Sequence, residues 1–202
     1  MHTGEHLQLT DGAGNIYTAA ITKADKKRCE VTVQERRFRE QEKRKICVAI
    51  SLLKNASRFE WFLEKATEIG VQEIIPLLCE RTERQHFRYD RMQGIVVAAM
   101  LQSQQCWLPN LHQPAAFQQV VVKKEYTDKR IAHCVAEKGK LLINSVPVQT
   151  AVQILIGPEG DFTSKEILLA LQHDYQPVSL GNTRLRTETA GVLASALLMY
   201  SH

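Results

Sequence analysis

The chain has 202 residues, of which 44% are hydrophobic and 24% are charged, and its formal net charge is +4 at pH 7. This length suits one large domain or two smaller ones, and the composition is that of a globular protein. The sequence has no apolar run of about 18 residues and no signal-peptide order at its start, so we expect a cytoplasmic protein that does not enter a membrane. The cysteines form no Cys-x-x-Cys pair and no Cys/His cluster has metal-ligand spacing, which predicts free thiols and no metal site.

The first part of the chain has the alternation of short β-strands. Residues 6–10 alternate, residues 11–15 have turn chemistry, and alternation resumes over residues 16–21 and 29–33. Gly12 and Gly14 are followed by a strand-like stretch instead of a helix, which favours a turn over a dinucleotide-binding loop. We predict a small β domain with its linker over residues 1–42, and a second domain over residues 43–202.

Positive charge is concentrated where these two predicted domains meet. The segment from Lys23 to Lys45 has ten Lys and Arg residues against five Asp and Glu residues. A basic patch on a nearly neutral body is what binding to a phosphate backbone requires. A solvated linker over residues 34–45 explains the same charge, so both interpretations stay open at this point.

After Lys45, strand-like apolar runs alternate with helical patterns. The alternation begins with a strand over residues 46–53, a helix that Asn55 or Ser57 could cap and that ends at Gly70, and a strand over residues 71–79. Helical patterns follow over residues 89–105 and 115–124, then strands over residues 130–136 and 152–156. Such alternation predicts an α/β domain with a mostly parallel sheet.

Two glycine corners near the end of the chain are the most informative segments. The strand that ends at Ile156 runs into Gly157-Pro-Glu-Gly160 and then into a helix for which Thr163 and Glu166 form a capping box. A second strand, residues 177–180, runs into residues 181–190 and then into an apolar helix, residues 191–200. Ligands bind beyond the carboxyl ends of parallel strands, so we expect the corners to form two walls of one pocket after adjacent strands.

The chemistry of these corners limits their function. Neither is a Walker motif or a Gly-x-Gly-x-x-Gly fingerprint, which disfavours nucleoside triphosphates and ordinary dinucleotide cofactors. Each corner alone is compatible with a purely structural role. Four charged residues at the corners favour a ligand site, namely Glu159, Arg184, Arg186 and Glu188.

Gly157–Gly160 together with Leu180–Ala190 resembles the paired signature of the SPOUT superfamily, and more specifically of the 16S rRNA (uracil-N3)-methyltransferase family. Residues 64–71 and the Gln102-Ser103 pair before Leu108-Pro109 are also similar to that family, in the same order. The resemblance implies an α/β domain whose mostly parallel sheet is tied in a trefoil knot, preceded by a PUA-like β-barrel that binds RNA. It further implies a homodimer that uses S-adenosylmethionine to methylate uracil N3 in the 16S rRNA of the small ribosomal subunit.

The chain departs from this family at two places. The family usually has a second glycine where this chain has Asp161, and it usually has further residues before the point where this chain begins. Because Asp tolerates a left-handed backbone better than most residues do, we expect Asp161 to preserve the loop. The β-barrel is expected to be incomplete at its start, which makes RNA binding a less secure expectation than cofactor binding.

The resemblance also implies which residues bind the cofactor and the RNA. S-adenosylmethionine would lie in three loops formed by Val135, Ala136, Ile156, Gly157, Pro158, Glu159, Gly160, Leu180, Gly181, Asn182, Leu185 and Thr189. The RNA would contact Lys26, Lys27, Arg28, Arg36 and Arg37, with a second line at Arg81, Arg84, Arg88 and Arg91. A solvated helix start explains that second line equally well.

Two residues are candidates for catalysis. Uracil N3 carries a proton and is a poor nucleophile until that proton leaves, so we expect Glu188 to act as the base and Arg186 to stabilise negative charge on the uracil oxygens. Alternatively, Glu188 caps the last helix, and Arg186 pairs with Glu188 or contacts RNA phosphate. Two other functions remain open: a related SPOUT enzyme acting on a tRNA or another rRNA position, and a non-catalytic RNA-binding protein of ribosome assembly.

Overall fold

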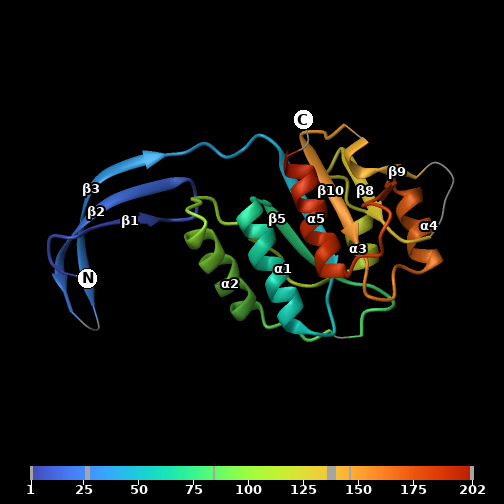
Figure 1. The fold of residues 1–202 in the computed structure, drawn as a ribbon, viewed down its shortest axis with the longest axis horizontal. Coiled ribbons are helices and arrows are strands. Elements are labelled where there is room, and N and C mark those ends of the chain that lie inside the picture. The colour runs from blue at the N-terminus through green and yellow to red at the C-terminus, as the bar shows by residue number, and fades with distance from the viewer. Residues whose placement is uncertain (1, 26–27, 84, 136–139, 146, 201–202) are drawn as a thin grey trace.

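The computed structural model describes residues 2–25, 28–83, 85–135, 140–145 and 147–200. It is an elongated molecule in which a small β domain extends from one end of a larger α/β domain (Figure 1). The β domain is a three-stranded antiparallel sheet in the order β1 (His6–Thr10), β2 (Asn15–Ala24) and β3 (Cys29–Phe38). Over the described ranges these strands form an open sheet and do not close into a barrel.

The predicted strands of the β domain are confirmed, but the predicted start of the linker is wrong. β3 continues to Phe38, so Arg36 and Arg37 pair with β2 at Tyr17 and Ile16 instead of lying in a linker. β3 is an edge strand and nearly all of it is exposed. Charged side chains are common on exposed edge strands, which explains why a charged segment remains part of the sheet.

The turn between β1 and β2 attaches the β domain to the α/β domain. Gly14 N donates to Cys106 O at 2.8 Å, and Leu108 N donates to Gly12 O at 2.9 Å. Gly14 has φ +91°, and a Cβ built there would lie 2.5 Å from the Trp107 ring. The glycines of this turn therefore allow the close approach of the two domains, in agreement with the predicted turn.

The α/β domain is built on a parallel sheet in the order β6-β5-β4-β10-β8-β11-β9, with β7 also paired to β5. Every pairing in this sheet is parallel, which confirms the predicted fold class. The strands are β4 (Lys45–Ser51), β5 (Glu73–Leu78), β6 (Asn110–Leu111), β7 (Ala115–Ala116), β8 (Asp128–Ala132), β9 (Leu141–Leu142), β10 (Ala151–Ile156) and β11 (Gln176–Ser179). The trefoil knot implied by the resemblance stays a prediction.

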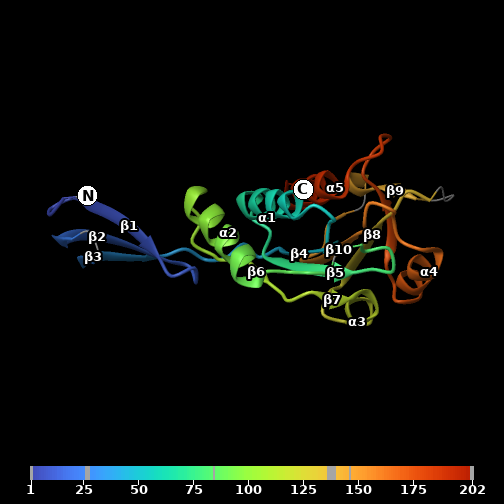
Figure 2. The same cartoon turned by 90° about the horizontal axis from the view of Figure 1, so that it is seen from below.

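Helices cover both faces of this sheet (Figure 2). One face carries α1 (Ala56–Ile69), α2 (Tyr89–Gln102) and α5 (Thr187–Tyr200), and the other carries α3 (Phe117–Val121) and α4 (Ser164–Gln172). A short 3-10 helix, Ile143–Ser145, precedes β10. Alternate side chains of β4 enter the two cores, with Val48 and Ile50 on the α1 side and Cys47 and Ala49 on the α3 side. A strand buried on both faces therefore appears in the sequence as a continuous apolar run.

Three helix ends agree with the predicted capping residues. Asn55 accepts a hydrogen bond from Ser57 N at the start of α1, and Gly70 ends that helix with φ +100°. Thr163 and Glu166 form the predicted capping box of α4. No helix in the part of the chain that the structure describes is long and apolar enough to cross a membrane.

Three predicted helices have wrong boundaries. α2 ends at Gln102 instead of Gln105, because the Ser103 hydroxyl bonds back to Ala99 O and Gln104 has a left-handed φ of +56°. α3 is confined to residues 117–121, since residues 115–116 pair with β5 as β7. α5 begins at Thr187 and not at residue 191, which places Glu188 in its first turn.

Candidate active site

The carboxyl ends of β8, β10 and β11 surround a cavity of about 1000 Å³. Three loops line it: the β8 loop (residues 133–135), the β10 loop (residues 157–161) and the β11 loop (residues 180–186). The start of α5 adds Thr187 and Ala190, and Lys140 lies on the same wall as the β8 loop. The two glycine corners thus face one cavity, at the edge of the sheet where ligands of open α/β folds bind.

The expected adjacency of the two strands before the glycine corners is wrong. β8 lies between β10 and β11 and pairs with both of them. The β8 loop therefore stands between the two corners and forms a third wall. Sequence pattern alone could not have supplied this order, because all three strands are short and none of them carries a signal that specifies its neighbour.

The β10 loop is held in place from several sides. Gly157 packs on Phe162, whose ring would lie 3.1 Å from an added Cβ. The Glu159 carboxylate accepts a hydrogen bond from Lys54 N at 3.3 Å, and Arg81 donates to Gly160 O at 2.6 Å. The loop is consequently tied to the segments that follow β4 and β5.

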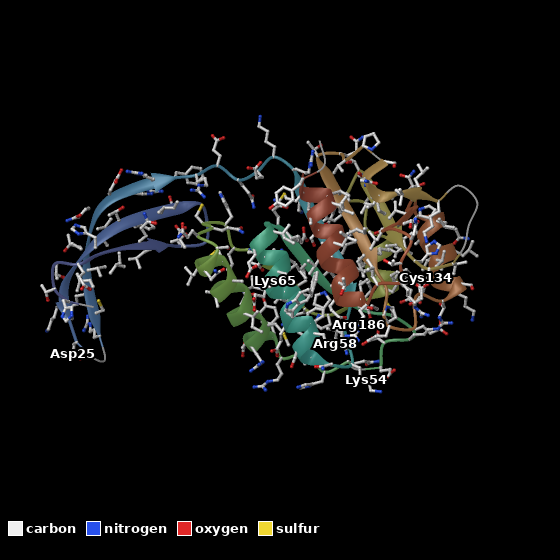
Figure 3. All side chains as sticks on the ribbon, in the orientation of Figure 1. Asp25, Lys54, Arg58, Lys65, Cys134 and Arg186 are labelled. Carbon is white, nitrogen blue, oxygen red and sulfur yellow. The ribbon has the colours of Figure 1, made fainter. Side chains whose placement is uncertain are left out.

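The β11 loop is more open than the β10 loop. Gly181 has φ +134° and nothing within 4 Å of a built Cβ, so its backbone borders open space. The Ser179 hydroxyl donates to Gly181 O at 3.0 Å and accepts from Gly181 N at 3.3 Å. Arg186 is exposed at the cavity and directly precedes α5, and Figure 3 labels it, Arg58 and Lys54 on the same side of the α/β domain in that view.

Glu188 occupies a buried position beside the cavity. Its side chain is 8% exposed, and Oε1 lies 3.6 Å from Nε of Arg58 on α1. The second carboxylate oxygen, Oε2, is buried and has no hydrogen-bond partner among the described residues. Glu188 itself does not line the cavity, whereas its neighbours Arg186 and Thr187 do. Glu188 therefore pairs with Arg58 and not with Arg186, the partner considered in the structural alternative.

Most of the predicted cofactor residues come together around this cavity. Those that line it are Val135, Ile156, Gly157, Pro158, Glu159, Leu180, Gly181, Asn182 and Leu185. Gly160 and Thr189 belong to the same segments but are not lining residues, and Ala136 lies outside the described residues. Their role in cofactor binding stays a prediction.

Several lining residues were not among the predicted cofactor residues. They are Ala132, His133, Cys134, Lys140, Asp161, Val178, Ser179, Thr183, Arg184, Thr187 and Ala190. His133 and Cys134 fell inside the strand predicted over residues 130–136, but β8 ends at Ala132, so both residues belong to the loop that lines the cavity. No sequence signal points to Arg58, which reaches Glu188 only through the packing of α1 on α5.

The predicted RNA-binding residues lie on two separate surfaces. Arg28, Arg36 and Arg37 are exposed on the β domain, where Arg37 pairs with Glu35 at 2.7 Å. Consecutive strand residues point to opposite faces, so Arg36 and Arg37 do not share one face. Arg81 and Arg88 are exposed on the α/β domain, whereas Lys26, Lys27 and Arg84 lie outside the described residues.

A buried cluster of ionisable groups lies at the opposite edge of the sheet. Glu73, at the start of β5, accepts from Lys45 Nζ at 2.8 Å, contacts His112 Nε2 at 2.6 Å and accepts from the Tyr126 hydroxyl. Burial raises the pKa of Glu73, but the hydrogen bonds from Lys45, Tyr126 and His112 outweigh it and hold the pKa below the ordinary value of 4.5. Lys45 and Glu73 begin β4 and β5, at the end of the sheet opposite the cavity, and none of the four groups lines the cavity.

The cysteines differ in their surroundings. Burial raises the pKa of both Cys47 and Cys79 to about 12, so these two cysteines stay protonated and inert. Cys29 and Cys134 are the exposed free cysteines, and Cys134 lines the cavity. Over the described ranges, no group of three or more His, Cys, Asp and Glu residues could hold a metal ion.

Comparison with known proteins identifies both domains. The family model of the RNA methyltransferase domain matches residues 40–199, and that of the RNA methyltransferase PUA domain matches residues 1–34. The ribosomal RNA small subunit methyltransferase E of Synechocystis sp. is 32% identical over 97% of this chain, and the chain spans 66% of that relative.

Solved structures agree with the family models. A probable rRNA-methyltransferase from Porphyromonas gingivalis is similar with a TM-score of 0.89 and 38% identity, over 96% of this chain and 84% of that one. A putative methyltransferase from Legionella pneumophila, solved with its bound cofactor SAM, has a TM-score of 0.89 and 31% identity over 98% of this chain and 84% of that one. The chain therefore belongs to the family of RNA methyltransferases that combine this α/β domain with a PUA domain.

Proposed function

We propose that this chain transfers a methyl group from S-adenosylmethionine to N3 of a uracil in the 16S rRNA of the small ribosomal subunit. The observation that carries the proposal is the single cavity into which the β8, β10 and β11 loops converge. The name of the Synechocystis relative supplies the class of substrate, and the resemblance of residues 157–160 and 180–190 supplies the uracil N3 position.

The residues around the cavity fit an adenosyl cofactor. A volume of about 1000 Å³ is ample for one, since ligand sites commonly measure roughly 300–1,000 Å³. Ile156, Leu180 and Leu185 provide apolar surface for the adenine ring of the cofactor. Gly157 and Gly181 let a ligand approach the backbone, and Gly181 borders open space where a side chain would intrude. We assign the cofactor to these three loops.

Methyl transfer requires the protein mainly to position the cofactor and the uracil. S-adenosylmethionine, when bound, supplies a methyl group on a positively charged sulfur. The transfer is an in-line displacement, so the protein accelerates it most by aligning the methyl group with uracil N3 and by excluding water. The β10 loop suits this task because Arg81 and the Lys54 backbone hold it from two sides.

Uracil N3 must lose its proton, and we assign this step to Glu188. Its Oε2 has no hydrogen-bond partner in the described part of the chain, and Glu188 adjoins the lining residue Thr187, so the carboxylate would take the proton once its side chain turns toward the cavity. Arg58, 3.6 Å from Oε1, orients the carboxylate and ties α5 to α1. Arg186 is exposed at the cavity and would balance negative charge on the uracil oxygens.

The proposal includes a partner, an oligomeric state and a location. The exposed arginines of β3 would hold the rRNA, and the enzyme would act in the cytoplasm, where ribosomes assemble. A homodimer is supported by α5, which is mostly apolar from Ala190 onward and whose Val192, Leu193 and Ala196 are only half-buried in one chain. Light scattering on the purified chain measures its mass and tests the homodimer directly.

The decisive test is methylation of undermethylated small-subunit particles with labelled S-adenosylmethionine, followed by mass spectrometry of the nucleosides. We expect N3-methyluridine. Another methylated nucleoside would support a related SPOUT activity. Absence of S-adenosylmethionine binding in calorimetry would support a non-catalytic RNA-binding protein.

The role of Glu188 needs a separate test. Single-turnover methylation by Glu188→Gln should be slowed by about 100-fold or more, which is the usual contribution of a general base. Calorimetry on the same variant controls for cofactor binding. A near-normal rate would exclude Glu188 as the base and leave it the structural role of pairing with Arg58.

A further inference from the structure

Asp161 has a backbone conformation that is uncommon among residues with a side chain. It ends the β10 loop with φ +63°, in the left-handed region that favours glycine. Asp and Asn enter this region more readily than other residues with a side chain, because their short polar groups can bond locally. Two explanations of Asp161 follow: the residue is present only because it tolerates the left-handed backbone of the turn, or its side chain has a function of its own.

The hydrogen bonds of Asp161 favour a function of its own. Oδ2 accepts from the backbone N–H of Cys134 at 2.8 Å, and Oδ1 accepts from Phe162 N at 2.8 Å. The bond from Phe162 is local to the turn. The bond from Cys134 joins the β10 loop to the β8 loop, and both Asp161 and Cys134 line the cavity.

The β10 loop is a firm base for such a link. Arg81 donates to Gly160 O at 2.6 Å, the Glu159 carboxylate accepts from Lys54 N, and Asp161 N donates to Pro158 O at 2.9 Å. The parallel ladder between β8 and β10 ends at the pair Ala132 and Ile156. The Asp161 carboxylate therefore extends the connection between these strands beyond the end of their backbone pairing.

We propose that Asp161 is a positioning residue that holds the Cys134 wall of the cavity against the β10 loop, so that S-adenosylmethionine meets a preformed site. This inference rests on the proposed function for the identity of the ligand. A charged acceptor makes a stronger hydrogen bond to a backbone N–H than a neutral one does. Fixing a binding loop in advance improves affinity by reducing the entropy lost on binding.

Three substitutions separate this role from a merely conformational one. Asp161→Gly adopts the left-handed backbone without strain but loses both side-chain hydrogen bonds. Asp161→Asn tolerates the same backbone and keeps one acceptor for Cys134 N–H. Asp161→Ala loses the hydrogen bonds and adds strain. If the role is purely conformational, Asp161→Gly should bind S-adenosylmethionine at least as tightly as the wild-type chain. If Asp161 positions the loop, Asp161→Asn should bind it more tightly than Asp161→Gly does.

The experiment is calorimetric titration of the full chain and these variants with S-adenosylmethionine, with thermal denaturation as the control for folding. We expect Asp161→Gly to raise Kd about tenfold, in line with the loss of a hydrogen bond to a charged group, and Asp161→Asn to raise it less. At saturating cofactor kcat should stay nearly unchanged, so that the loss appears in KM.

Amide hydrogen exchange gives a readout that needs no ligand. Exchange at the Cys134 amide should be faster in Asp161→Gly than in the wild-type chain when neither has cofactor. Equal exchange at Cys134 together with equal cofactor affinity in Asp161→Gly would overturn the inference. If the wild-type chain fails to bind S-adenosylmethionine, the proposed function fails, and the exchange measurement still decides whether Asp161 links the two loops.

Discussion

Replacing Arg130 with methionine should destabilise the α/β domain strongly, because Arg130 connects three segments from a fully buried position. Its guanidinium donates to both carboxylate oxygens of Asp128, at 2.9 and 2.7 Å. It also donates to Ile143 O at 3.0 Å and to Pro147 O at 2.9 Å. Arg130 thereby fastens the segment before β10 to β8, the strand whose end supplies the Cys134 wall of the cavity.

The expected magnitude follows from what Arg130→Met leaves behind. The Asp128 side chain is 7% exposed, so the variant retains a buried negative charge that is neither hydrated nor paired with a cation. Removing one partner of such a buried pair costs about 3–5 kcal/mol of unfolding free energy. At roughly 2–4 °C per kcal/mol, the melting temperature should fall by about 6–20 °C. Removing both charges, in Arg130→Met with Asp128→Leu, should restore most of the loss.

Thermal and urea denaturation followed by circular dichroism measures this loss. Arg91→Met is a matched control in the same domain: Arg91 also binds a carboxylate through two bonds, to Glu60 at 2.6 and 2.8 Å, but its side chain is 53% exposed. Exposed pairs contribute little, so this control should melt close to the wild-type chain. If Arg130→Met lowers the melting temperature no more than Arg91→Met does, the argument from burial is wrong.

Three further predictions concern packing, pH and ligand access. Gly191→Ala should cost about 1–3 kcal/mol in urea denaturation, because its Cβ would lie 2.7 Å from the Phe62 ring; unchanged stability would show that α5 shifts freely. The Glu73 carboxyl has a lowered pKa when folded, so it stabilises the fold above its unfolded pKa of about 4.5, and this contribution is lost as the pH falls through the folded pKa. Acid titration of Glu73→Gln should show a smaller loss in that window, and an identical profile would contradict the assignment. S-adenosylmethionine should slow alkylation of Cys134 but not of Cys29, as measured by peptide mass spectrometry; equal slowing at both thiols would argue against the cavity as the binding site.

The elements of the fold could be predicted from the sequence because their signals are local. Residues 46–50 are a continuous apolar run and residues 152–156 are apolar except for Gln153, as expected of strands covered on both faces. The order of the strands could not be predicted in the same way. β10 lies between β4 and β8, which both precede it in the chain, and nothing in residues 151–156 specifies those neighbours. β6 and β9 have two residues each and are too short to show a period.

The sequence predicted those parts of the site that are formed by local turns. Glycines after apolar runs located the β10 and β11 loops, since such corners have a recognisable composition. The link between Asp161 and Cys134 depends on β8 being the neighbour of β10, and the pair between Arg58 and Glu188 depends on α1 packing against α5. Contacts of this kind come from tertiary packing, which a single sequence does not display.

The positions of the basic residues suggest how RNA affinity and methyl transfer are divided. β3, with Arg36 and Arg37, lies at one end of the molecule, while Arg58 and Arg186 lie at the cavity edge of the α/β domain (Figures 1 and 3). Phosphate contacts at the two places add to affinity separately, and each loses strength as salt rises. Neutralising Arg36 and Arg37 should therefore weaken rRNA binding and reduce its salt dependence while S-adenosylmethionine binding stays unchanged, because β3 lies at the other end of the molecule from β8 and β10, whose loops line the cavity (Figure 1).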